Sequence, residues 1–166
     1  MQPRKPSRFR AFLSVAAVAC LTLALAGCPK IPKRIPGTSG DKKIRVAVHV
    51  SEKANDGNPV ALDLVMVSDK KLFEKLREMT AEEWFKNREQ IKLDYPKKGQ
   101  VEVRSWEWVP EQLIPVNEIT VPAEIRGGVV FANYFKPGAH RAVVDPRKPF
   151  TIKLGPEKLE IETGKN

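Results

Sequence analysis

The sequence predicts a mainly β protein, in which a two-sheet sandwich carries a helical insertion. After residue 43, short segments of alternating apolar and polar residues recur along the chain, and prolines separate many of them. Only the region after the second such segment shows apolar residues at the three- and four-residue spacing of helices. Seven or eight short strands with one helical insertion favour two packed sheets around a shared core.

The first two strands are expected over 44–50 and 60–67. Apolar residues occupy alternate positions in 44–50, which is typical of a strand with one buried face and one wet face. Residues 60–67 are apolar on both faces except at Asp63, as expected of an inner strand. Between them, 51–59 contains no large apolar side chain and is predicted to be a loop. Because this loop is longer than a tight hairpin needs, recognition of a partner is one of its two possible roles, and simple connection is the other.

The helical insertion is expected to span about residues 69–91. Ser68 and Asp69 suit the start of a first helix. Thr80 and Glu83 form a capping box, so a second helix should run over about 81–90. The apolar residues expected to face the core are Leu72, Phe73, Leu76, Met79, Trp84, Phe85 and Ile91.

The remaining strands are expected over 101–109, 113–121, 125–134, 141–144, 150–154 and 158–162. In the first of these, Trp106 and Trp108 share one face. The favoured interpretation is that they cover the helical insertion. Alternatively they form an exposed patch, a possible second site for binding a partner.

Residues 1–27 have the features of a secretory signal peptide. Basic residues precede an apolar run over 11–26, which is interrupted only by Ser14 and Thr22. This run is shorter than the roughly 20 residues that a membrane-spanning helix needs. The sequence Leu25, Ala26, Gly27, Cys28 closes the run and resembles the lipobox of bacterial lipoproteins. That resemblance implies cleavage before Cys28, a diacylglycerol on its thiol and a further acyl chain on its new amino terminus.

Three acyl chains would hold the protein on a membrane essentially permanently, since stable anchoring takes more than one chain. Pro29 follows the cysteine, where many Gram-negative lipoproteins retained at the inner membrane have aspartate. We therefore expect the protein at the inner leaflet of the outer membrane, facing the periplasm. Residues 28–43, rich in proline, glycine and basic side chains, are expected to be a flexible tether, and 44–166 a single folded domain.

The basic charge of the chain does not indicate nucleic-acid binding. The formal net charge is +9, but four basic residues and no acidic ones lie in 1–27, and 28–43 holds five basic residues against Asp41. Residues 44–166 are nearly neutral, whereas a nucleic-acid surface needs basic residues clustered on the folded domain. With Cys20 in the signal peptide and Cys28 acylated, the folded domain is expected to stand without a disulfide.

No pattern of catalytic, metal-binding or cofactor-binding residues stands out. His49 and His140 lie in different predicted elements, with no cysteine or carboxylate at ligand spacing. An enzyme is therefore not expected, and neither is a metal or cofactor. A second class of function stays open, in which the sandwich binds a small envelope ligand such as glycan. An open aromatic groove containing Trp84, Trp106 and Trp108 would favour it, whereas buried tryptophans and an exposed polar loop would favour a protein adaptor.

The order of these elements resembles the TssJ family, the outer-membrane lipoproteins of the type VI secretion system. The resemblance begins at the lipobox and continues through the loop at 54–59 and the strand at 60–67, which leads into Leu72 and Phe73. It extends through the insertion to residues 128–134, a hydrophobic strand ending in Ala, any residue, Tyr, and to Arg141. Here His140 stands where the family usually has tryptophan.

The resemblance implies a transthyretin-like sandwich that binds the periplasmic carboxy-terminal domain of the inner-membrane protein TssM. In that family, the loop between the first two strands contributes to the TssM contact. The candidate residues for partner binding are accordingly Glu52, Lys53, Asn55, Asp56 and Asn58.

Overall fold

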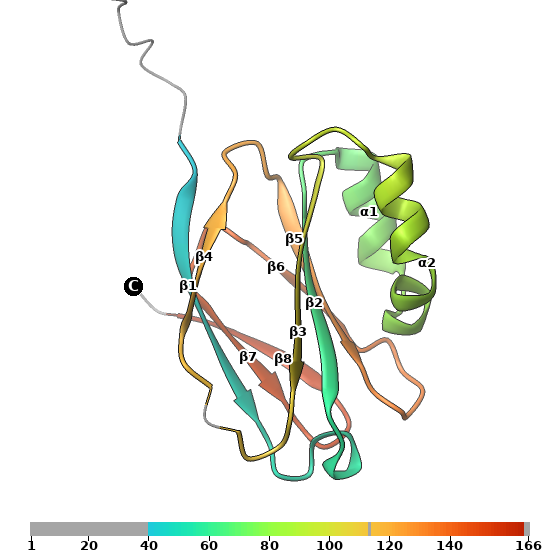
Figure 1. Ribbon diagram of the computed structural model, residues 1–166, viewed down its shortest axis with the longest axis vertical. Coiled ribbons are helices and arrows are strands. Elements are labelled where there is room, and N and C mark those ends of the chain that lie inside the picture. Colours follow the sequence, from blue (N-terminus) through green and yellow to red (C-terminus); the bar gives the residue numbers. More distant parts are fainter. Residues whose placement is uncertain (1–39, 113, 165–166) are drawn as a thin grey trace, which may run out of the picture. The chain divides into compact units, whose positions relative to one another are not determined.

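The computed structural model describes residues 40–112 and 114–164, which contain eight strands, two α-helices and one short 3-10 turn (Figure 1). The strands are β1 (Lys42–Val50), β2 (Val60–Val67), β3 (Val101–Trp108), β4 (Asn117–Val121), β5 (Gly127–Asn133), β6 (Arg141–Val144), β7 (Phe150–Leu154) and β8 (Leu159–Thr163). The helices are α1 (Lys70–Glu78) and α2 (Ala81–Asp94), and the 3-10 turn is η1 (Ala54–Gly57). The predicted signal peptide, Cys28 and most of the tether lie outside the described residues. No helix in the described ranges is long and apolar enough to cross a membrane.

The strands form two four-stranded sheets, which confirms the predicted sandwich. One sheet has the order β4-β1-β7-β8 and the other β3-β2-β5-β6. Strand β1 pairs in parallel with β7, and every other pair is antiparallel. Because β1 and β2 belong to different sheets, the segment between them is a crossover and not a hairpin. This explains why it is longer than a two-residue turn.

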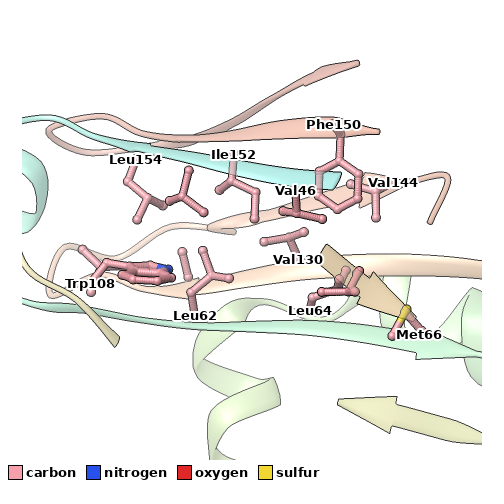
Figure 2. Close-up of a cluster of buried hydrophobic side chains, with 14 of the residues drawn as sticks. Val46, Leu62, Leu64, Met66, Trp108, Val130, Val144, Phe150, Ile152 and Leu154 are labelled. Atoms are coloured by element: carbon pink, nitrogen blue, oxygen red, sulfur yellow. The ribbon is translucent and has the colours of Figure 1, made fainter. Parts of the chain in front are cut away.

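The main core lies between the two sheets (Figure 2). Val46 and Ile152 of the first sheet belong to the same buried cluster as Leu62, Leu64 and Val130 of the second sheet. Each of these side chains is almost completely removed from water, and this burial is the main favourable term in folding.

The two helices cover the outer face of the second sheet and bury a second core beneath them (Figure 1). Trp84 of α2 stacks on Phe131 of β5, with ring centroids 5.3 Å apart. Beside it, the buried Asp63 carboxylate of β2 accepts hydrogen bonds from Trp84 Nε1 at 2.9 Å and from Arg88 at 3.0 Å. Strand β2 is therefore covered on both faces, which accounts for its nearly continuous apolar sequence.

Both predicted helix starts are confirmed. The Asp69 side chain accepts a hydrogen bond from Leu72 N at 2.8 Å, and Thr80 and Glu83 form the reciprocal capping box. Hydrogen bonds from Thr80 lower the pKa of Glu83, because they favour the charged carboxylate. Helix α2 continues to Asp94, four residues beyond its predicted end.

Several strand boundaries differ from the predicted ones, among them the starts of β1 and β4. Strand β1 begins at Lys42, which pairs with Val121, so the last two residues assigned to the tether belong to the sandwich. Strand β4 begins at Asn117 and not at 113, because its pairing with β1 starts at Val46. Within the expected strand, Pro115 lacks the N–H group that a sheet ladder requires.

The interpretation that Trp106 and Trp108 cover the helical insertion is wrong. Side chains alternate between the two faces of a strand, and in β3 it is Val101 and Val103 that pack beneath the helices. Trp108 lies in the core between the sheets, and the half-buried Trp106 packs against that core. The helical spacing and the strand alternation were both visible in the sequence, but which face of β3 met the helices was not.

Candidate functional site

Three connections meet at one end of the sandwich, which we call the loop end. They are residues 51–59 between β1 and β2, 134–140 between β5 and β6, and 155–158 between β7 and β8. Their proximity follows from the strand register, since Ala61 at the start of β2 pairs with Asn133 at the end of β5, and Val50 at the end of β1 pairs with Leu154 at the end of β7. The five partner-binding residues predicted in the first loop, between 52 and 58, all lie at this end.

The crossover loop 51–59 has an unusual backbone. Asn55, Asp56 and Gly57 have φ angles of 50°, 55° and 80°, which lie in the left-handed region. Asparagine, aspartate and glycine tolerate this region best, so the sequence Asn-Asp-Gly suits the turn.

Asn55 ties the three connections together. Its backbone N–H donates to Pro156 O at 3.1 Å, and its side-chain Oδ1 accepts from Phe135 N at 2.7 Å. Its Nδ2 donates to Pro59 O at 2.9 Å within its own loop. The residue is only 2% exposed, so these bonds replace those that water would otherwise make. Asn55 therefore shapes the surface from beneath it.

Tyr134 also links two of these connections by hydrogen bonds beneath the same surface. Its hydroxyl lies 3.0 Å from Gly155 O and 3.1 Å from Lys158 O, both acceptors in the β7–β8 connection. Burial raises the pKa of Tyr134 to about 12, so the hydroxyl keeps its proton at neutral pH and remains a donor. The Tyr134 ring stacks on His140, with centroids 4.7 Å apart.

Charged side chains on the outside of the loop end also join the connections. Lys136 pairs with Asp56 at 3.7 Å and with Glu157. The hydrogen bond to Glu157 and the charge of Asp56 raise the pKa of Lys136, and the same hydrogen bond lowers that of Glu157. Because these groups are exposed, the pairs contribute little to stability and act mainly by positioning the loops.

The predicted partner-binding residues divide into two groups. Glu52, Lys53, Asp56 and Asn58 are exposed at the loop end, where a partner could touch them. Asn55 is buried, as described above.

The predicted second patch does not lie on the surface, since Trp108 is buried and Trp106 is half-buried. Trp84 lies on the opposite face of the second sheet, beneath the helices. The three tryptophans therefore do not share the open groove that would have favoured a glycan-type ligand.

Sequence reasoning missed Phe135, which lies next to Lys136 at the loop end and is 70% exposed. It lies in the connection between β5 and β6, two residues after β5 ends at Asn133. The available signal was a large apolar residue in a predicted turn, next to Lys136, Pro137 and Gly138.

Within the part of the chain that the structure describes, no three His, Cys, Asp or Glu side chains are grouped so that they could hold a metal ion. What the loop end offers is a set of charged, amide and aromatic groups held in fixed positions.

Comparison with known proteins identifies relatives of the fold. No protein-family model and no curated protein matches the sequence. Among solved structures, the T6SS lipoprotein TssJ1 from Pseudomonas aeruginosa aligns with a TM-score of 0.57 at 16% identity, over 76% of this chain and 98% of that one. Serratia marcescens Lip, described as a membrane-bound component of the type VI secretion system, aligns with a TM-score of 0.57 at 10% identity, over 76% and 99% of the two chains.

A third similar chain comes from a structure described as the T6SS protein TssM C-terminal domain from EAEC. It aligns with a TM-score of 0.51 at 13% identity, over 73% of this chain and 98% of that one. At such low identities the likeness concerns the fold. It confirms the TssJ-like sandwich that the sequence resemblance implied.

Proposed function

We propose that this protein is an outer-membrane lipoprotein adaptor of a type VI secretion membrane complex. Its lipidated Cys28 would hold it at the inner leaflet, and its sandwich would bind the periplasmic domain of a TssM-like inner-membrane protein. The observation that carries the proposal is the loop end. There, a fold shared with type VI lipoproteins presents Glu52, Lys53, Asp56 and Asn58 on a backbone fixed by Asn55.

A binding role, without catalysis, suits this arrangement. Hydrogen bonds hold the loop before any partner arrives, so less conformational freedom is lost on association. Anchoring in a membrane also confines the adaptor to a thin layer, which raises its effective concentration for a partner that crosses the periplasm.

Exchanging the charges of Glu52 and Lys53 tests the proposed surface. Neither side chain forms an ion pair with the described residues, so the Glu52→Lys/Lys53→Glu protein keeps its internal contacts and its net charge. We expect affinity for the TssM periplasmic domain to fall about tenfold, because favourable charge contacts become repulsive. Binding of the purified domains, measured by calorimetry or interferometry, gives this value.

The matched control exchanges Lys98 and Glu124, which are also exposed and precede β3 and β5 at the opposite end of the sandwich. Lys98→Glu/Glu124→Lys should bind as the wild type does. Equal affinities for both exchanged proteins would move the contact away from residues 52 and 53. Deleting Glu52–Asn58 is a weaker test, since it also removes Asn55 and thereby frees the 134–140 connection.

A further inference from the structure

Phe135 is an exposed aromatic side chain whose backbone is rigidly held. It is 70% exposed, although burying a large apolar side chain is more favourable than leaving it in water. Its backbone N–H donates to the buried Asn55 Oδ1 at 2.7 Å. On either side, Tyr134 is hydrogen-bonded to the β7–β8 connection and Lys136 is held by two carboxylates. The ring is therefore displayed on a backbone that has little ordering left to lose on binding.

The surroundings of Phe135 indicate the chemistry of what would cover it. Phe135 borders a hollow of about 240 Å³, which Glu82, Lys136 and His140 also line. Lys136 is already paired with Asp56 and Glu157, and Glu82 forms no ion pair with the described residues. The three connections of the loop end carry three exposed acidic residues, Glu52, Asp56 and Glu157, and three exposed basic residues, Lys53, Lys136 and Lys158, so charges of both signs surround the exposed ring.

We infer that Phe135 is the hydrophobic anchor of the adaptor's contact with the TssM-like periplasmic domain. Its ring would enter an apolar pocket on that domain, with polar and charged side chains of the partner around the rim. Aromatic anchors inside a polar rim are the usual arrangement of binding hot spots. The inference rests on the proposed function and adds to it a residue and a pocket chemistry.

The test compares Phe135→Ala with Leu93→Ala in the full-length lipoprotein, purified in detergent. Leu93 is the matched control because it is 72% exposed and lies in the last turn of α2, whereas Ala81, at the first turn, borders the hollow. The probe is the purified periplasmic domain of the TssM protein from the same organism. Phe135→Ala should weaken binding about 30-fold, as expected for a hot spot, and Leu93→Ala should leave binding unchanged.

The outcomes separate this inference from the function on which it rests. If the wild type binds the domain and Phe135→Ala binds equally well, the anchor is wrong and the proposed function stands. If the two alanine proteins lose the same affinity, the effect is not specific to the loop end, and the anchor is again wrong. If the wild type does not bind the domain at all, the proposed function fails and takes this inference with it. Because both side chains are exposed, both variants should keep the thermal unfolding midpoint of the wild type.

Discussion

Replacing Cys28 with serine is expected to remove the protein from the outer membrane. The lipobox resemblance assigns all of the membrane anchoring to acyl chains on this one residue, and serine cannot receive the thioether-linked diacylglycerol. Each buried methylene contributes about 0.8 kcal/mol, so loss of the chains removes far more free energy than the basic residues near the anchor can replace. The measurement is the distribution of the protein between separated inner-membrane, outer-membrane and soluble fractions.

Cys20→Ser is the matched control, since it makes the same chemical change within the predicted signal peptide. It should leave the protein in the outer membrane. Mass spectrometry of the mature amino-terminal peptide should show acylated Cys28 in this control and in the wild type. A Cys28→Ser protein that still sediments with the outer membrane, or an unmodified thiol at Cys28 in the wild type, would contradict the lipoprotein assignment.

The fold could be predicted from local patterns because most of its elements are determined by local chemistry. The alternation in 44–50 and the capping box of Thr80 and Glu83 each depend on a few neighbouring residues, and both were confirmed. The apolar character of β2 also identified it correctly as an inner strand. The parallel pairing of β1 with β7 was not predicted, because it joins segments about 100 residues apart and leaves no local signal.

The candidate site could be predicted only in part, for the same reason. Its crossover loop was visible as a polar segment between two strands. Asn55 is buried because it bonds to the backbone of Phe135 and Pro156, and these two residues come from connections that are distant in the sequence. Exposure of Phe135 likewise depends on where β5 ends relative to those loops. A single sequence does not show which distant segments lie close together in the fold. Here that proximity determines which residues are exposed to a partner.

The polar contact beneath α2 provides the stability prediction with the largest expected effect. Asp63 is 1% exposed and Trp84 is fully buried, so the carboxylate is the acceptor that satisfies the indole N–H at 2.9 Å. Arg88 approaches the same oxygen at 3.0 Å, while its own side chain remains 35% exposed. Trp84 also stacks on Phe131, so the carboxylate helps to hold α2 in place on the second sheet.

Asp63→Ala should lower the free energy of unfolding by about 3 kcal/mol, because it leaves the buried Trp84 N–H without an acceptor and opens a small cavity. Arg88 can turn toward water, which places the value at the lower end of the range for breaking buried pairs. Urea unfolding of a soluble form that begins at residue 29 measures the change, and Glu124→Ala, which removes an exposed carboxylate, should stay within about 0.5 kcal/mol of the parent.

A double-mutant cycle with Trp84→Phe identifies the cause of that loss. Phenylalanine keeps an aromatic ring against Phe131 but has no N–H to satisfy, so Trp84→Phe should cost less in the Asp63→Ala protein than in the parent, by about 1 kcal/mol. If the effects of the two substitutions simply add, the hydrogen bond does not hold the helix. Packing alone would then account for the position of α2, and the burial of a charged side chain in β2 would lack this explanation.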